Sequence, residues 1–276
     1  MPEVIEVYNT ALFLKNTLKN KSINDINIIK GRYFRHGSFK NFDLFKNNLP
    51  LKVIDVKNKG KFIYIILEKD FYIFNTLGLR GGWCSYKNGK FKFAKLMDRY
   101  KNIKLNNLNV SFSISNNNIV YFYDTLSFGT LKIVNNKEEL FKKLDSIGPD
   151  IMFVSYDIFR EQLLQNKNLN KIIINVLMNQ KVISGIGNYL RSDILWMSKV
   201  NPFQLVKNLS EKDIQNIYKN ANILTNEKEG SPENYDRDFF VYRSDYDIYG
   251  NKVKSERLYN GKDSRMIYWV ENRQKL

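Results

Sequence analysis

The chain begins Met1-Pro2-Glu3, and these residue types could carry covalent chemistry on a sugar. When Met1 is removed, Pro2 presents a terminal secondary amine, a nucleophile that can attack a sugar carbon and form an imine (Schiff base). An α-amino group titrates at about pH 8, so part of the Pro2 amine is neutral at physiological pH. The adjacent Glu3 could move protons if its surroundings raise its pKa. Proline also suits the first turn of an ordinary helix, so a purely structural interpretation stays open.

Three further residues could hold phosphate groups. In the segment Gly185-Ile186-Gly187-Asn188, backbone amides at the start of a helix can point at a phosphate, and Asn188 adds a side-chain donor. Lys61 follows Gly60 at the start of an alternating strand, and Arg265 lies in a predicted hairpin, where its guanidinium could bind two oxygens at once. Taken singly, each of these features is more typical of an ordinary helix connection or a solvated surface cation.

The composition favours a polyanionic partner. Lysine and arginine number 44 against 28 acidic residues, a formal net charge of +16 at pH 7. Nucleic acid is the first candidate for such a surface, with a solvated lysine-rich surface as the alternative. The chain has one cysteine, Cys84, and one histidine, His36. An internal disulfide is therefore excluded and a structural zinc site lacks ligands, so we expect neither a metal nor a cofactor.

The length of 276 residues suits about two domains. No apolar run approaches the ~20 residues of a membrane span, and the first residues lack a basic segment followed by an apolar stretch. The sequence therefore predicts an intracellular protein that acts in the compartment holding the genome and is not secreted.

Hydrophobic periodicity predicts the elements that position these residues. Apolar residues from Val4 to Leu18 recur at helical spacing, which predicts a helix that fixes the amino terminus. From about residue 23 to 133 the pattern is strand-like and predicts a β-rich domain, a sandwich. The clearest predicted strands cover residues 51–56, 62–67, 71–77, 110–114 and 119–123, with Asn116, Asn117 and Asn118 as a turn.

Helices follow after Asn136. Predicted helices cover residues 138–146, 156–165, 171–180 and 189–198, and a capping box of Ser210 and Asp213 begins another that runs to about Leu224. Polar residues 226–238 form a predicted linker. Two last strands, residues 253–259 and 266–270, are joined by the turn pair Asn260-Gly261. We expect a β-sandwich domain over residues 1–133, a helical domain over 134–235, and a β-hairpin over 236–276.

Residues 185–196, Gly-Ile-Gly-Asn-Tyr-Leu-Arg-Ser-Asp-Ile-Leu-Trp, closely resemble the helix-two-turn-helix (H2TH) signature of the Fpg/Nei family of DNA glycosylases. The Asn-Tyr-Leu-Arg and Ile-Leu-Trp parts look like the endonuclease VIII (Nei) branch. The start is similar to the family's Met-Pro-Glu-x-Pro-Glu, with Ile5 replacing the second proline. Ser264 to Trp269 resemble the end of the Nei zinc finger, but Val270 and Arg273 stand where its cysteines would fall. This looks like the zincless finger of some Nei-like members.

The resemblance implies an α+β fold: an N-terminal β-sandwich domain and a C-terminal helical domain with the H2TH and a zincless β-hairpin finger. DNA would run between the two domains. It implies a bifunctional DNA glycosylase and AP lyase of base excision repair. The implied catalytic residues are Pro2 as Schiff-base nucleophile, Glu3 as proton donor, Lys61 for β-elimination, and Arg265 for δ-elimination, the last two also contacting phosphate. The implied DNA-binding residues are Asn188, Leu79, Gly187 and Glu6.

The substrate is less defined than the chemistry. The Nei-like motif implies oxidised pyrimidines in double-stranded DNA, with ring-opened purines and hydantoins as additional substrates. Single-stranded DNA is left open and a monomer is expected. Leu79 is the expected filler of the gap left by a flipped base. A second arm, often Asp-x-Arg-Arg-Phe-Gly in the family, reads here from Asp124 to Gly129 without the arginines. A non-catalytic H2TH protein, or a degenerate member that only binds damage, therefore stays an alternative.

Overall fold

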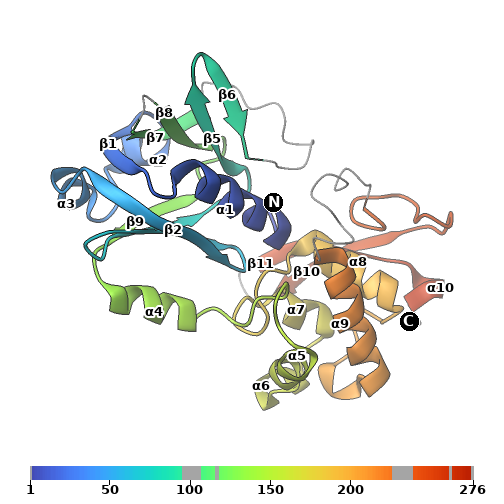
Figure 1. Cartoon of the computed structure of the whole chain (residues 1–276). Helices are drawn as coiled ribbons and strands as arrows, with labels where there is room; N and C mark the ends of the chain where they lie inside the picture. Colours follow the sequence, from blue (N-terminus) through green and yellow to red (C-terminus); the bar gives the residue numbers. More distant parts are fainter. Residues whose placement is uncertain (1, 95–106, 116–117, 226–238, 261–262, 275–276) are drawn as a thin grey trace. The chain divides into compact units, whose positions relative to one another are not determined.

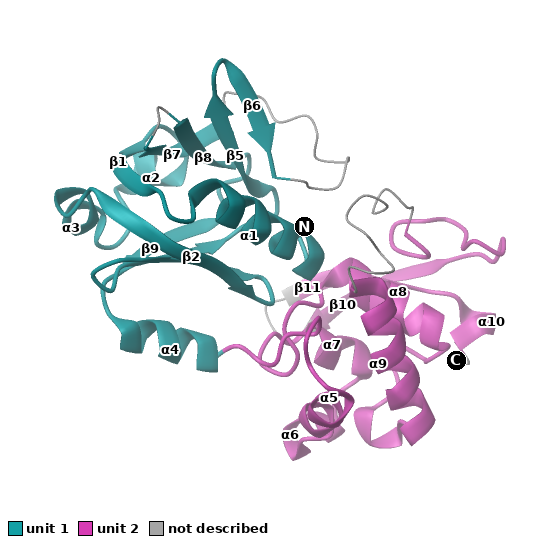
Figure 2. Cartoon of the chain, viewed as in Figure 1, with its two compact units in different colours: residues 1–146 teal, residues 147–276 magenta. Residues whose placement is uncertain are grey.

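The structure, a computed structural model, describes residues 2–94, 107–115, 118–225, 239–260 and 263–274. The chain divides into two compact units, Met1–Ser146 and Ile147–Leu276, which are coloured separately in Figure 2. Within the described residues, no helix is long and apolar enough to cross a membrane.

Unit 1 is a β-rich body with one long helix (Figure 1). In chain order its elements are α1 (Val4–Leu18), β1 (Ser22–Ile28), α2 (Arg32–His36), α3 (Phe42–Asn47), β2 (Leu51–Lys59), β3 (Phe62–Leu67), β4 (Tyr72–Thr76), β5 (Gly81–Lys87), β6 (Lys90–Phe93), β7 (Leu108–Ile114), β8 (Asn118–Asp124), β9 (Thr130–Val134) and α4 (Lys137–Asp145).

The strands form one sheet in the order β6-β5-β8-β7-β1-β2-β3-β4-β9, and each neighbouring pair is antiparallel. The β1–β2 pairing is short, limited to Ser22 with Lys52 and Ile23 with Leu51. The short β1–β2 pairing divides the sheet into two halves, and side chains from both halves belong to one hydrophobic core. The Trp83 indole on β5 donates to Asn75 Oδ1 on β4 at 3.0 Å, although these strands are not neighbours. The sheet therefore closes on itself as a sandwich.

Helix α1 packs one apolar face against this core. Val7, Ala11, Leu14 and Leu18 recur every three or four residues, and all are buried in the cluster. The helix packs mainly along β2. Burial of this stripe holds the first turn of α1 against the sandwich, so the amino terminus has a fixed place in unit 1.

Unit 2 is helical with a two-stranded hairpin. Its elements are α5 (Tyr156–Leu163), α6 (Asn166–Leu169), α7 (Ile173–Met178), α8 (Asn188–Ser198), the 3₁₀ helix η3 (Val206–Asn208), α9 (Glu211–Thr225), β10 (Lys254–Asn260), β11 (Asp263–Trp269) and α10 (Glu271–Gln274). Helix α8 is central, since it contacts α7, α9, α10 and β11. The hairpin therefore packs on the helices within one unit.

The predicted fold class is confirmed, with a β-rich N-terminal part and a helical C-terminal part. The capping box at Ser210 is present, because the Asp213 amide donates to Ser210 Oγ at 3.2 Å while the Ser210 amide donates to Asp213 Oδ2 at 2.9 Å. Helix α7 is shorter than predicted. Asn116, Asn117, the 226–238 linker and Gly261 lie outside the described residues.

The prediction of an alternating strand after Lys61 is wrong. Phe62, Ile63, Tyr64 and Ile65 are all buried, so neither face of β3 is solvated there. The physical reason is that both faces of β3 are covered. Ile63 and Ile65 lie in the sandwich core, and on the other face the Phe62 ring packs against Tyr64 and Phe74, with Lys143 of α4 over it. Lys61 itself lies in the two-residue turn between β2 and β3, at the edge of this covered surface.

Candidate functional site

The amino terminus is built around two buried carboxylates. Glu3 is 0% and Glu6 is 2% exposed. Glu3 is the N-cap residue of α1, and its backbone amide donates to Glu6 Oε2 at 2.8 Å. An acidic side chain in the first helical turn is favoured by the helix dipole. Pro2, also buried, is thereby joined to a cap that fixes the direction of the chain as it enters the helix.

Lys61 is placed by a tight connection. The turn between β2 and β3 has only two residues, Gly60 and Lys61, and Gly60 has φ +52°. The pairing of Lys59 with Phe62 closes this turn. The first turn of α1 and the end of β2 lie on the same side of unit 1 (Figure 1). The β2–β3 turn therefore presents Lys61 on the side of the unit that also carries the amino terminus.

Leu79 and the 124–129 loop come from distant parts of the chain but lie together. Gly78, before Leu79, has φ +63°, and a Cβ there would lie 2.5 Å from the Gly129 amide nitrogen. The Asp124 carboxylate accepts from the amides of Leu126 at 3.0 Å and Gly129 at 2.5 Å. These two hydrogen bonds fix the backbone conformation of the loop. Leu126 is 43% and Phe128 59% exposed, so the loop presents two apolar side chains outward. Sequence reasoning did not single out either residue as an apolar contact.

In unit 2 the glycine-containing segment forms the connection between α7 and α8. Gly185 has φ +105°. The side-chain amide of Gln180 makes two hydrogen bonds to the backbone of this segment. Its Oε1 accepts from the Gly185 amide at 3.0 Å, and its Nε2 donates to the Ile186 carbonyl at 2.8 Å. Gly187 is the N-cap of α8. The predicted helix, glycine turn and helix are therefore present.

Asn188 begins α8 and also touches the hairpin. Its Nδ2 donates to the Met266 carbonyl on β11 at 3.0 Å. Arg191, which is 2% exposed, donates to Asn188 Oδ1 at 2.5 Å and to the Ile174 carbonyl at 3.3 Å. Arg191 was not among the predicted site residues. Its position three residues after Asn188 on the same helix face is the signal that could have found it.

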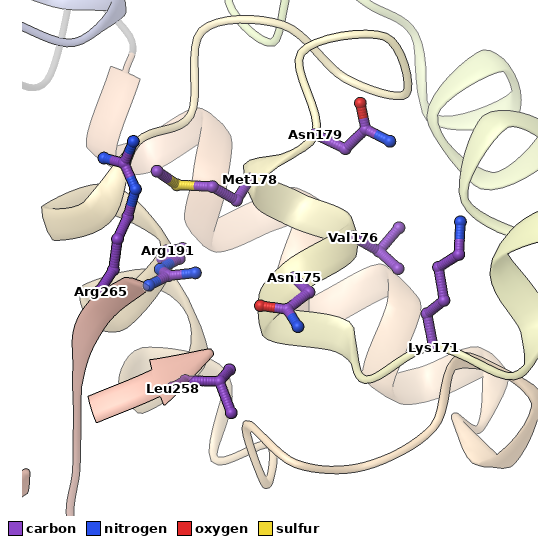
Figure 3. Close-up of a pocket in the computed structure, with 8 residues that line it drawn as sticks. All are labelled: Lys171, Asn175, Val176, Met178, Asn179, Arg191, Leu258 and Arg265. Carbon is purple, nitrogen blue, oxygen red and sulfur yellow. The ribbon is translucent and has the colours of Figure 1, made fainter. Parts of the chain in front are cut away.

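Arg265 and Arg191 line one pocket of about 260 Å³, shown in Figure 3. Arg265 and Arg191 lie on one side of the pocket and Lys171 on the other, and the Arg265 side chain extends away from the Arg191 guanidinium. The remaining lining residues are Asn175, Val176, Met178, Asn179 and Leu258. Three basic side chains and no acidic one line this space, which suits an oxyanion such as a phosphate.

The hairpin that carries Arg265 is anchored through Asp247. Its Oδ2 accepts from the Trp196 indole at 3.1 Å, and its Oδ1 accepts from the amides of Tyr249 at 2.9 Å and Asn251 at 2.8 Å. Partial burial acts to raise the pKa of Asp247, but the hydrogen bonds from Asn251, Trp196 and Tyr249 outweigh it and leave the pKa below the usual range. The turn is therefore closed around an ionised carboxylate.

Arg273 completes the anchor. Its guanidinium lies 4.1 Å from the Trp196 ring centroid and 5.1 Å from that of Tyr249, and its Nε donates to the Trp196 carbonyl at 3.1 Å. Val270, at the other position where the resemblance expects a cysteine, is buried in the same cluster. Among the described residues, no group of three or more His, Cys, Asp or Glu side chains could hold a metal ion.

The predicted residues fall into two sets. Pro2, Glu3, Glu6, Lys61 and Leu79 belong to unit 1, and Gly187, Asn188 and Arg265 belong to unit 2. Within unit 1 the sequence-distant Leu79 and Phe128 loops come together, and within unit 2 Asn188, Arg191 and Arg265 do. Each unit thus offers surfaces suited to nucleic acid: an exposed apolar loop in one and a basic pocket in the other.

Comparison with known families covers nearly the whole chain. Residues 1–131 match the profile described as the formamidopyrimidine-DNA glycosylase N-terminal domain, residues 147–228 match its H2TH domain, and residues 229–275 match its C-terminal domain. The order of these domains is that of a two-unit DNA glycosylase with an H2TH. This fold and domain order define the class.

Two relatives illustrate the similarity. The formamidopyrimidine-DNA glycosylase of Wolbachia sp. subsp. Drosophila simulans is 30% identical over 219 residues, covering 79% of this chain and 74% of that protein. That of Mycoplasma genitalium is 28% identical over 225 residues, covering 80% of this chain and 72% of the relative. The chain belongs to the formamidopyrimidine-DNA glycosylase (Fpg) family, a family of DNA repair glycosylases. The endonuclease VIII-like branch and the zincless finger stay predictions.

Solved structures show the same fold. The Lactococcus lactis Fpg in complex with DNA containing an abasic site superposes with a TM-score of 0.78 at 17% identity, covering all of both chains. MutM in complex with DNA containing carbocyclic 8-oxo-G gives a TM-score of 0.79 at 18% identity, again over both whole chains. At 17–18% sequence identity, these two structures show a similarity of fold alone.

Proposed function

We propose that this protein is a bifunctional DNA glycosylase and AP lyase that removes oxidised bases through a Schiff base at Pro2. The observation that carries the proposal is the capped amino terminus, where buried Glu3 and Glu6 fix the chain immediately after Pro2. A nucleophile must be held in one orientation to act efficiently. The capping box accounts for Glu6, but a proline that merely started a helix would not require the fully buried carboxyl of Glu3 beside it.

The proposed reaction is a substitution at C1′ of the damaged nucleotide, followed by two elimination steps. The Pro2 nitrogen forms a bond to C1′ as the bond from C1′ to the base breaks, and Glu3 supplies a proton to the ring oxygen as the ring opens. The resulting iminium withdraws electrons from C2′. Loss of the C2′ proton then expels the 3′ phosphate, and a second elimination expels the 5′ phosphate. Lys61 assists the first elimination and contacts phosphate, and Arg265 assists the second.

Phosphates flanking the lesion are held in unit 2. Arg265, Arg191 and Lys171 line one basic pocket, and an arginine fork can donate to two phosphate oxygens. The Gly187 amide and the Asn188 side chain lie at the start of α8, where a helix favours an anion. Because the Asn188 side chain links α8 to β11, a phosphate bound there would contact the helix and the finger hairpin together.

The space left by a flipped base is filled by apolar side chains. Leu79 and the exposed Leu126 and Phe128 come from two loops that pack against each other at Gly78 and Gly129. Apolar wedges of this kind enter a base step and offset part of the unstacking cost. Glu6 is fully engaged in the cap, so its part in DNA binding would be to hold Glu3 and Pro2 in place.

For the lesion we propose oxidised pyrimidines, on the strength of the endonuclease VIII-like sequence Asn188-Tyr189-Leu190-Arg191. Ring-opened purines are the competing class, because the relatives above carry the name formamidopyrimidine-DNA glycosylase. Excision from matched duplexes bearing 5-hydroxyuracil or a formamidopyrimidine separates the two. Faster release of the purine lesion would reverse the assignment without affecting the Schiff-base chemistry.

Borohydride trapping tests the reaction. The protein is incubated with duplex DNA bearing an oxidised pyrimidine or an abasic site, and the imine is reduced to a stable covalent complex. We expect a complex with the wild-type protein and with Lys137→Ala, an exposed control, but none with Pro2→Gly or with a form that retains Met1. Intact DNA binding without any trapped complex on either substrate would point to a damage-binding protein that lacks catalysis.

A further inference from the structure

A basic surface in unit 1 has no role in the reaction above. Between Ile29 and Lys40 the chain carries four lysine or arginine residues and no acidic one. We define the α2 patch as Lys30, Arg32, Phe34, Arg35 and His36, all of which are exposed. Phe34 is 68% exposed. Within the described part of the chain, none of its four basic side chains forms an ion pair.

The α2 patch is fixed to the sandwich. The Tyr33 hydroxyl donates to the Leu131 carbonyl at 2.9 Å and accepts from the Leu131 amide at 2.6 Å. Gly31, which begins α2, has φ +82°, and a Cβ there would lie 2.1 Å from Asn109 Nδ2. The positive φ favours glycine here, and the absence of a Cβ lets the start of α2 lie against the side chain of Asn109.

Asn109 links the α2 patch to the 124–129 loop. Its carbonyl accepts from the amides of Ile29 at 2.8 Å and Lys30 at 3.2 Å, and its Oδ1 accepts from the Asp124 amide at 3.1 Å. Arg35 Nη2 also lies 3.5 Å from Ser127 Oγ. The positively charged helix and the loop that presents Leu126 and Phe128 are therefore parts of one rigid surface.

We propose that the α2 patch binds DNA phosphates next to the base step that Leu126 and Phe128 enter. The inference rests on the proposed function, because it takes those two side chains as the wedge. Arg35 touches the loop itself, so the backbone beside the entered step meets this guanidinium first. Arg32, Lys30 and His36 continue the positive surface, and Phe34 offers a ring for an apolar contact with sugar or base. Such contacts position the duplex without reading its sequence.

The salt dependence of DNA binding tests this proposal. The substrate is a duplex with a tetrahydrofuran abasic analogue, and the matched variants are Arg32→Ala/Arg35→Ala and Lys137→Ala/Lys142→Ala. The control pair removes the same charge from exposed positions of α4, which lies apart from α2 in unit 1 (Figure 1). Each lost phosphate contact lowers the slope of log K against log salt by about 1, so we expect a fall of about 2 for the α2 variant and little change for the control.

Equal slopes for wild type and the α2 variant would overturn the proposal, and so would an equal fall in the control. If Arg35→Ala disturbs the loop through Ser127, Lys30→Ala makes the same test with a fall of about 1. Trapping at saturating enzyme separates this inference from the reaction. Absence of trapping in the wild type would overturn the Schiff-base proposal and leave the slope comparison valid.

Discussion

Arg191 donates a 2.5 Å hydrogen bond to the side-chain oxygen of Asn188, one turn earlier on α8. The same asparagine donates through Nδ2 to the Met266 carbonyl of the hairpin, the residue next to Arg265. A buried guanidinium thus orients the amide that joins the helix-two-turn-helix to the finger. The three residues act as one element of unit 2.

We therefore expect Arg191→Ala to lower the free energy of unfolding by about 1–3 kcal/mol, because Asn188 Oδ1 and the Ile174 carbonyl each lose a buried donor. Affinity for abasic-site DNA should fall as well, since Arg191 lines the basic pocket. Chemical denaturation and fluorescence anisotropy measure the two effects. The control is Arg160→Ala, which breaks a solvent-exposed ion pair with Glu211 and should leave stability almost unchanged. A non-additive double variant with Asn188→Ala would establish that the two side chains are coupled.

Glu6 should act through the cap of α1. Glu6→Ala removes the acceptor for the Glu3 amide and should cost about 0.5–2 kcal/mol of stability, with slower trapping because Pro2 loses its fixed entry into the helix. Glu6→Gln retains an acceptor oxygen, so this variant should keep most of the stability and most of the trapping rate of the wild type. Thermal unfolding and single-turnover trapping give the comparison. If Glu6→Ala were trapped at the same rate as the wild-type protein, the cap would not position the nucleophile.

Opposite-base preference should be weak. Leu126 carries no hydrogen-bonding group and is exposed at the tip of the 124–129 loop, so it cannot distinguish the base facing the lesion by hydrogen bonds. Excision rates opposite A, C, G and T should agree within about threefold, a smaller difference than the about 1–3 kcal/mol that a good bidentate contact supplies. Leu126→Arg should widen the range. Strong discrimination by the wild type would require a polar contact from another residue.

The hairpin anchor should weaken in acid. The pKa of Asp247 is lower in the folded protein than its ordinary value of 3.8. Its ionised form therefore stabilises the fold fully above the unfolded pKa, and this contribution is lost as the pH falls through the folded pKa. Asp247→Asn should lower the melting temperature at neutral pH, and the difference from wild type should shrink toward pH 3. A constant difference across that range would contradict the assignment.

Cys84 should be unreactive in the native protein. The thiol lies on β5 with 0% exposure, and burial raises its pKa to about 12. Iodoacetamide at pH 8 should leave the folded protein unmodified and label it once in denaturant, as read by mass spectrometry. Labelling of the native protein at a rate similar to that of the denatured chain would show that β5 opens readily.

The sequence by itself determined the elements that depend on local patterns. The 3.6-residue spacing from Val7 to Leu18 defined α1, and the Ser210–Asp213 pair marked the start of α9. The linked motifs at Pro2, Gly185 and Arg265 led to the family, because their residue types and order could be compared without coordinates. Lys61 was predicted from its Gly-Lys context. The alternation expected after it was absent, because side chains of β4 and α4 cover the second face of β3.

Only the tertiary structure decided which distant residues meet. Leu79 and Phe128 share a surface because Gly78 admits the Gly129 backbone. Asp247 closes the hairpin turn against Trp196, and Arg191 joins Asn188 in one pocket with Arg265. The α2 patch is coupled to the 124–129 loop through Asn109. Each of these contacts depends on packing between segments far apart in the chain, where hydrophobic period and turn chemistry carry no information about the partner.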